Sequence, residues 1–241
     1  MQYNDELYGK VAITEPLLLD LIASAAVQRT KGIAQHGITA FLGITPLFSR
    51  FDHSVGAMLL VRRLGADVNE QAAALLHDIS HTAFSHVIDF VLDDHSGQGY
   101  HEEKKEAFVG NTDIPSILNR HGLDWRDCIQ AEEFSLLEQP LPALCADRLD
   151  YFFRDLKFLK LAIGGEIRAA LESLEVVAGR IAVNNSIAAR WLAYTFIEAD
   201  RASWSSFREV GLYQLTAEAI KTANQYGLIG EADLWGSDEA L

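Results

Sequence analysis

The sequence is poor in cysteine and has no long apolar run, and each shortage excludes a class of protein. It has two cysteines, Cys128 and Cys145, among 241 residues, too few for a disulfide framework or a thiolate zinc site. We expect no disulfide between them. No apolar run approaches the roughly 20 residues of a membrane-spanning helix. Acidic Asp5 and Glu6 stand where a signal peptide would carry basic residues. These shortages predict a soluble, cytoplasmic protein.

Clustered positive charge is also missing. The formal net charge is −14, and no block of Lys and Arg interrupts it. Such a surface repels phosphate backbones and anionic lipids, so neither duplex nucleic acid nor a membrane is expected as a partner. A small anionic substrate remains compatible if a metal ion and a few arginines make one pocket locally positive.

Helical spacing of apolar residues dominates the chain and predicts a mainly α fold. The length suits one domain, placed at residues 1–230, followed by a loose acidic tail at 231–241. One small β-hairpin is expected in the C-terminal half, with strands at Leu174–Val177 and Ile181–Val183. Residues 38–50 and 93–99 are expected to be loops. Helices are predicted over residues 52–64, 70–80, 83–91, 101–109, 114–121, 127–137 and 143–161, and within 186–227.

A histidine followed directly by an aspartate ends the apolar pattern at His77-Asp78. Burying an imidazole beside a carboxylate costs on the order of several kcal/mol unless something compensates them. With His53 upstream and Asp147 downstream, the pair supplies two neutral imidazoles and two carboxylates. Such a set makes a nearly charge-balanced site for one divalent cation.

Histidines gather around this pair. Five of the eight fall within 49 residues, namely His53, His77, His81, His86 and His101. The spacing of four between His77 and His81 places both on one face of the predicted helix. Asp147, Tyr151 and Asp155 are likewise four apart on the long predicted helix. A solvated polar face is the other explanation for that stripe.

Four segments carry these residues, in the order 50–56, 75–86, 101–102 and 146–155. Together they resemble the HD-domain metal-dependent phosphohydrolases, and most of all their deoxynucleoside triphosphate triphosphohydrolase branch. The resemblance covers about residues 28–155 and continues weakly to about residue 220. It implies a helical-bundle HD domain with a metal-site core at about 28–160 and a C-terminal helical extension at about 161–230. Ser80 replaces a usual glycine, which indicates a divergent subfamily.

The resemblance also implies roles. The implied metal ligands are His53, His77, Asp78 and Asp147, for one divalent ion among Mn, Fe, Zn, Mg, Ni and Co. Proton transfer and its orientation are implied for His81, His101 and Asp89. Phosphate contacts are implied for Arg50 and Arg148, and other substrate contacts for His86, Tyr151, Asp155 and Gln35.

The leading hypothesis is a phosphohydrolase that cleaves a phosphoester or phosphoanhydride of a nucleotide or similar small metabolite by attack of a metal-activated water. Two alternatives stay open. One is a dinuclear oxygenase or phosphodiesterase of the HD type, with His81 and His101 in a second metal site. The other is a non-catalytic, metal-containing scaffold that binds a nucleotide or protein. A homodimer is also open, since Trp191, Trp204 and Phe207 fit a core or a dimer face. The core is preferred.

Overall fold

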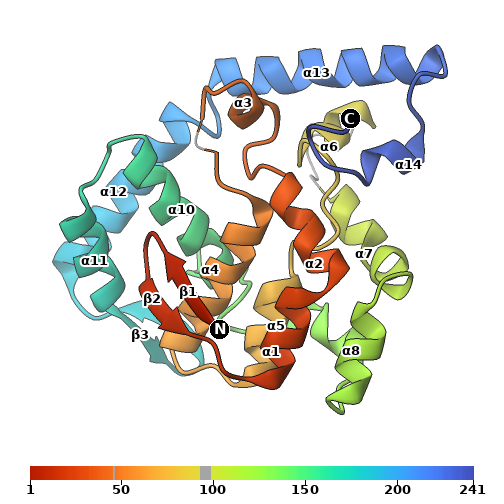
Figure 1. Ribbon diagram of the computed structural model, residues 1–241. Helices are drawn as coiled ribbons and strands as arrows, with labels where there is room; N and C mark the ends of the chain where they lie inside the picture. Colours follow the sequence, from red (N-terminus) through yellow and green to blue (C-terminus); the bar gives the residue numbers. More distant parts are fainter. Residues whose placement is uncertain (46, 93–98) are drawn as a thin grey trace.

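A computed structural model describes residues 1–45, 47–92 and 99–241. Two helices, α4 (Arg50–Arg63) and α5 (Val68–Leu76), occupy its middle (Figure 1). Around them lie α1 (Pro16–Ala23), α2 (Ala25–Arg29), α3 (Ile38–Phe41), α6 (Val87–Val91), α7 (Tyr100–Gly110), α8 (Ile114–Arg120), α9 (Trp125–Cys128), α10 (Ala146–Phe158), α11 (Gly164–Glu172), α12 (Ser186–Ala202), α13 (Phe207–Gln225) and α14 (Glu231–Leu234), with 3-10 turns η1 (Thr30–Gly32) and η2 (Ala131–Glu133).

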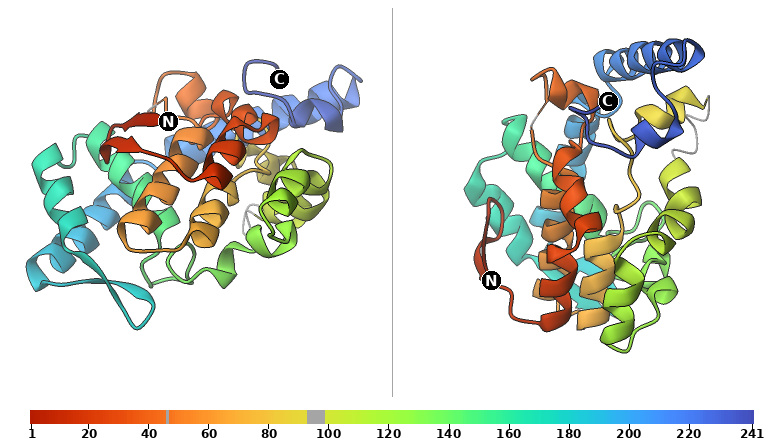
Figure 2. Two further views of the ribbon diagram at one scale, coloured as in Figure 1. Left: turned by 60° about the horizontal axis from the view of Figure 1, so that its bottom comes forward. Right: turned by 45° about the vertical axis from the view of Figure 1, so that its right-hand side comes forward.

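Helix α4 is buried along most of its length because other helices surround it. It packs against α5 and α10, while α1 covers α5. Helices α7 and α8 lie on one side of this pair and α10–α12 on the other (Figures 1 and 2). Met58, Leu60, Leu76 and Phe153 are fully buried at the centre, and each contributes roughly 1.5–3 kcal/mol by leaving water. The predicted mainly α fold is confirmed.

Helix α4 begins earlier than predicted because Ser49 caps it. The Ser49 hydroxyl accepts a hydrogen bond from the Asp52 backbone N–H, and the Asp52 carboxylate accepts one from the Ser49 N–H. This reciprocal cap satisfies N–H groups that a helix start leaves unpaired. Helix α5, by contrast, ends at Leu76 rather than Ser80. His77 and His81 therefore do not share a helix, and a turn separates them.

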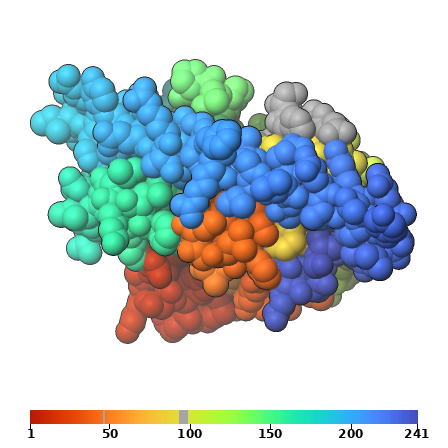
Figure 3. Space-filling model, turned by 90° about the horizontal axis from the view of Figure 1, so that it is seen from above, coloured from red at the N-terminus to blue at the C-terminus, as the bar shows by residue number. Residues whose placement is uncertain are grey.

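A second, smaller core lies under α13. Phe84, Val87 and Phe90 pack there against Ala217 and Ile220. Helix α13 runs along the upper edge in Figure 1. Seen from above, α12 and α13 (blue) cross this face beside the orange segment that contains α3 (Figure 3). Helix α13 thus covers the segment from Phe84 to Phe90, which follows His81 in the chain.

The predicted hairpin is confirmed as β3 (Leu174–Val177) and β4 (Arg180–Val183), paired antiparallel. Its turn residues Ala178 and Gly179 have φ of 49° and 76°, as a tight hairpin turn requires.

A further hairpin, β1 (Gln2–Asp5) with β2 (Gly9–Ala12), was not predicted. Its strands are short and mostly exposed, so no apolar alternation marks them. The Asp5 carboxylate closes the turn by accepting from the N–H groups of Leu7 and Tyr8.

Several other local predictions need correction. Helix α3 lies within the predicted loop 38–50. In place of the helix predicted over 127–137, the structure has the end of the short helix α9 and the 3-10 turn η2. The loop predicted at 93–99 falls outside the described residues, apart from Gly99. Cys128 and Cys145 are both free, as expected. Trp191 and Trp204 pack against the core, but the preference for a core position is wrong for Phe207, which is 94% exposed.

The last eleven residues are not a loose tail. Asp238 is buried, and its carboxylate accepts hydrogen bonds from the backbone N–H groups of Ala34 (2.8 Å) and Phe84 (2.7 Å). The Trp235 ring stacks on Phe108. The acidic composition predicted exposure to solvent. Instead, the Asp238 carboxylate accepts hydrogen bonds from two backbone N–H groups that would otherwise be unpaired. Within the described residues, no helix has the length and apolarity to cross a bilayer; the cytoplasmic location stays a prediction.

Candidate metal centre and substrate pocket

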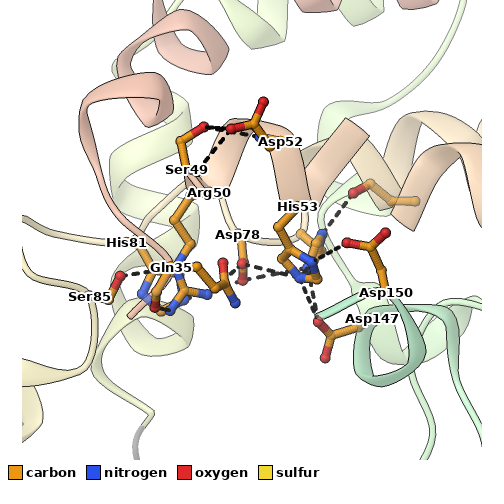
Figure 4. Close-up of polar contacts among 12 residues, drawn as sticks. Gln35, Ser49, Arg50, Asp52, His53, Asp78, His81, Ser85, Asp147 and Asp150 are labelled. Carbon is orange, nitrogen blue, oxygen red and sulfur yellow. Dashed lines mark hydrogen bonds and ion pairs between the residues drawn. The ribbon is translucent and has the colours of Figure 1, made fainter. Parts of the chain in front are cut away.

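Three separate helical segments bring the predicted metal ligands together. The Nε2 atoms of His53 on α4 and His77 after α5 lie 3.2 Å apart. Asp147 Oδ1 on α10 is 2.9 Å from the first and 3.3 Å from the second. Asp78 completes the group, with carboxylate oxygens 3.7 Å from His53 Nε2 and 3.6 Å from His77 Nε2. Figure 4 shows His53 between Asp78 and the α10 carboxylates.

This donor set fits a divalent cation. His77 Nδ1 donates to the Ala74 carbonyl at 2.7 Å, and His53 Nδ1 lies 2.9 Å from Asp150 Oδ2. With their Nδ1 hydrogens committed, both rings direct Nε2 toward the same point. Two imidazole nitrogens and two carboxylates facing one point repel each other unless a cation or protons lie between them. Such orientation of a ligating histidine through its other nitrogen is usual in metal sites.

The pKa shifts agree with this fit. Burial lowers the pKa of His53, but hydrogen bonds to Asp147 and Asp150 outweigh it and raise the pKa to about 9. The pKa of His77 is also raised, since Asp78 and Asp147 outweigh its burial. Burial alone would raise the pKa of Asp78, but Arg50 and His77 hold it well below its usual range. Without an ion, the shift to about 9 favours a proton on His53, which a bound cation would have to displace.

Residues behind His53 hold it in place. Asp150 accepts from Tyr8 OH at 2.8 Å and from Arg154 Nε at 2.8 Å, and Arg154 also bonds Asp5 at 2.8 Å. Gly56 makes room for this network. A Cβ at its position would lie 2.1 Å from Asp150 Oδ1 and 2.2 Å from Arg154 Nη2. No role was predicted for Asp150, although it follows Asp147 by three residues on the same helix.

Arg50 links the metal ligands to the next group of residues. Its Nη1 donates to Asp78 Oδ2 at 2.6 Å, and its Nε donates to Ser85 Oγ at 3.0 Å (Figure 4). Nη2 donates to the Gln35 carbonyl at 3.4 Å. The buried guanidinium thereby orients Asp78. The turn that carries His81 is held from the other side by Arg29, which donates to the Ile79 and His81 carbonyls.

A cluster of three histidines adjoins Asp78. His81 Nε2 lies 3.3 Å from Asp78 Oδ1, and the His81 ring stacks on His101 with centroids 3.9 Å apart. His86 meets His81 edge-on at 4.9 Å. Burial and the neighbouring Arg50 hold the pKa of His81 well below its ordinary value, so the ring is neutral at physiological pH. Asp89 lies 3.1 Å from His86 Nδ1 and thus orients His86 rather than His81.

Beyond Arg50 lies a cavity of about 260 Å³ under the N-terminal end of α13. Asp155 is fixed in its wall, with Oδ1 2.8 Å from His36 Nε2 and Oδ2 accepting from Trp204 Nε1 at 2.7 Å. The Trp204 ring also packs edge-on against Tyr151. Five predicted substrate-contact residues line the cavity: Gln35, Arg50, His86, Tyr151 and Asp155. It is also lined by residues for which no such contact was predicted: His36, Trp204, Glu209 and Tyr213.

Comparison with known proteins agrees with this geometry. The model of the HD domain family matches residues 50–155, the interval that carries all four metal-ligand candidates. The metal-dependent phosphohydrolase cns2 of Cordyceps militaris is 40% identical, and the match covers 98% of this chain and 70% of that protein. The chain belongs to the HD-domain metal-dependent phosphohydrolases.

More distant members fit the same family. A homologue of the deoxynucleoside triphosphate triphosphohydrolase SAMHD1 from Dictyostelium discoideum is 24% identical over 74% of this chain and 40% of its own length. A crystal structure of a phosphohydrolase from Bacteroides thetaiotaomicron has the same fold, with a TM-score of 0.67 and 23% identity. That match covers 93% of this chain and 60% of the other.

Not every predicted residue of this HD-domain protein reaches the pocket. The Arg148 guanidinium donates to the carbonyls of Ala143 (2.8 Å) and Gln139 (3.2 Å), and it lies 3.6 Å from Glu138. It is thus directed to the loop before α10 rather than to the cavity lined by Arg50. Its predicted phosphate contact would require a change of side-chain conformation.

Proposed function

We propose that this HD-domain enzyme hydrolyses a phosphate ester of a nucleotide or a similarly small metabolite. One observation carries the proposal. Arg50 and His86 line the cavity, and both connect it to the candidate metal ligands: Arg50 pairs with Asp78 at 2.6 Å, and His86 packs on His81, whose Nε2 lies 3.3 Å from Asp78. A reacting phosphoryl group and its leaving group would then lie in one continuous site.

His53, His77, Asp78 and Asp147 would hold the divalent ion. When bound there, such an ion supplies a Lewis acid for a phosphoryl oxygen and lowers the pKa of a water molecule. Arg50 neutralises charge on the phosphoryl oxygens. His101, stacked on the neutral His81 and 3.2 Å from Glu102 through Nε2, is the group that we assign to proton transfer to the leaving oxygen.

The charges support a substrate with one phosphoryl group in the pocket. Among the described residues that line the cavity, Arg50 supplies the only guanidinium or ammonium group. Since Arg148 faces another loop, a triphosphate would meet little further positive charge. We therefore expect phosphomonoesters to be hydrolysed with a higher kcat/KM than the corresponding triphosphates.

A panel of mono-, di- and triphosphates, incubated with protein loaded in turn with each candidate metal, tests the proposal. Phosphate release is expected from at least one monoester. His101→Ala should lower kcat by about 10²- to 10⁴-fold, the range of one proton-transfer group, and leave metal content unchanged. His121→Ala is the matched control, because His121 pairs with Asp20 on another part of the protein. Absence of turnover throughout the panel contradicts the proposal.

A dinuclear enzyme is the second candidate. The observation in its favour is that His81, His86 and His101 each offer a ligand atom, all within 4.8 Å of one another. Asp78, 3.3 Å from His81 Nε2, could then bridge two ions. A metal content near two ions per chain, reduced to one by His86→Ala, would favour this candidate.

A further inference from the structure

Besides Arg50 and His86, the pocket contains acidic residues that the proposed chemistry does not use. Asp155 and Glu209 both line it. The two carboxylates differ in the number of their hydrogen-bond partners within the protein. Asp155 has a protein partner on each oxygen, His36 on one and Trp204 on the other.

Glu209 lacks a second partner. It lies in the first turn of α13, is 7% exposed, and accepts the Ser203 hydroxyl on Oε1. No described residue donates to its Oε2. The residue as a whole is buried, and no arginine pairs with its carboxylate, because Arg50 is committed to Asp78. A donor from a ligand would satisfy the free oxygen.

A second acceptor in the pocket is also unsatisfied. Gln35 Oε1 is buried and has no hydrogen-bond partner. The Gln35 backbone carbonyl accepts a hydrogen bond from Arg50. Gln35 therefore lies beside the guanidinium that we assign to the phosphoryl oxygens. The pocket thus presents one free acceptor beside the phosphoryl position and another, Glu209, on α13.

Four aromatic residues also line the cavity: Phe90, Tyr151, Trp204 and Tyr213. Tyr151 and Trp204 meet edge-on at 5.2 Å, and Phe90 and Tyr213 at 5.7 Å. Tyr213 is held by its hydroxyl on the His36 carbonyl at 3.1 Å. Rings of this kind favour a flat, unsaturated group between them. The cavity volume of about 260 Å³ is below the roughly 300 Å³ at which pockets for drug-sized ligands begin, so the group is small.

We propose that Glu209 determines substrate specificity by accepting a hydrogen bond from the exocyclic amino group of a nucleobase on the leaving group. This inference rests on the proposed phosphoesterase function. Its consequence is discrimination between bases with an amino group and bases with a carbonyl at the same position. A carbonyl there would face the Glu209 carboxylate with two acceptors and no hydrogen between them.

The test compares kcat/KM for adenosine and inosine monophosphates, and for cytidine and uridine monophosphates. We expect the amino-bearing member of each pair to be preferred by at least about tenfold, the effect of one unpaired buried polar group. In Glu209→Gln, which keeps the side-chain size and can keep an acceptor for Ser203, the preference should fall to about one or reverse, through KM more than kcat. Glu218→Gln, on an exposed face of the same helix, should leave the preference unchanged.

Each ratio is measured within one protein, so a partial loss of folded enzyme cancels. Equal turnover of amino and carbonyl substrates, or a preference that survives Glu209→Gln, overturns the inference and leaves the phosphoesterase proposal intact. Hydrolysis of a generic aryl phosphate without hydrolysis of any nucleotide also overturns the inference about Glu209 and leaves the phosphoesterase proposal intact. Absence of turnover with every ester overturns both.

Discussion

His53 Nε2 lies 3.2 Å from His77 Nε2, while the Nδ1 atom of each ring is bonded elsewhere, to Asp150 and to the Ala74 carbonyl. Side chains from two different segments are thus turned so that their free nitrogens converge. Convergence of acceptors costs free energy in a protein that holds nothing between them. In this protein the two nitrogens converge beside two carboxylates, those of Asp78 and Asp147.

Asp150→Asn should weaken metal binding about 10- to 100-fold, the usual effect of losing a residue that orients a metal ligand. The carboxylate fixes the His53 ring and raises the electron density on its Nε2. Titration of metal-free protein with Mn²⁺ or Zn²⁺ in a calorimeter measures the change. Tyr8→Phe removes one hydrogen bond to Asp150 and should have a smaller effect, whereas Asp127→Asn, at an exposed position, should have none. Unchanged affinity in Asp150→Asn would contradict the assigned role.

Gly56→Ala should destabilise the protein by about 3 kcal/mol or more, because the new methyl group would displace the buried Asp150–Arg154 pair. Gly211→Ala provides the matched control. It also lies in a helix, but no atom comes within 4 Å of its added Cβ, and alanine favours helices by up to about 1 kcal/mol over glycine. Chemical denaturation gives both free energies. Equal stability of the two variants would show that close packing at residue 56 is unimportant.

The stabilisation by metal should increase with pH. The raised pKa of His53, about 9 against an ordinary 6.5, means that its proton stabilises the metal-free fold fully below pH 6.5, and that this contribution is lost as pH rises through 9. Binding an ion must displace that proton, and its cost falls over the same interval. The metal-induced rise in melting temperature should therefore be larger at pH 9 than at pH 6.5. If the metal-induced rise in melting temperature did not depend on pH, metal binding would not displace the proton from His53.

Asp238→Ala should cost about 2 kcal/mol or more, because two backbone N–H groups, those of Ala34 and Phe84, lose their acceptor. Ala34 directly precedes the pocket residue Gln35, and Phe84 lies two residues before the pocket residue His86. We expect KM for the hydrolysed ester to rise with the loss of stability. Glu239→Ala, its exposed neighbour, serves as control. Equal stability of the two variants would argue that the C-terminal segment is dispensable.

Local patterns were enough to predict the mainly α fold and the β3–β4 hairpin. The His77-Asp78 pair stood out because it ends an apolar helix pattern, whereas the ligand roles of His53 and Asp147 were implied by the resemblance to the HD-domain family. The end of α5 at Leu76 was not predictable in this way, because the turn that follows is held by Arg29, which is distant in sequence.

The pocket was only partly predictable for the same reason. His36 and Asp150 lay next to recognised residues and could have been noticed. Glu209 could not, because it faces the cavity only when α13 packs on α3 and α6. Arg148 shows the opposite limit: its position in the motif predicted a phosphate contact, but the carbonyls of Ala143 and Gln139 bind its guanidinium.

Metal content per chain tests the central claim most directly. The protein purified in the presence of Mn²⁺, Zn²⁺ or Fe²⁺ is analysed by inductively coupled plasma mass spectrometry beside Asp147→Asn and the exposed control Asp127→Asn. We expect close to one ion per chain in the wild type and the control, and a large loss in Asp147→Asn. Full metal retention in Asp147→Asn, or a wild type that binds no divalent ion, would contradict a single centre shared by α4, the His77-Asp78 turn and α10.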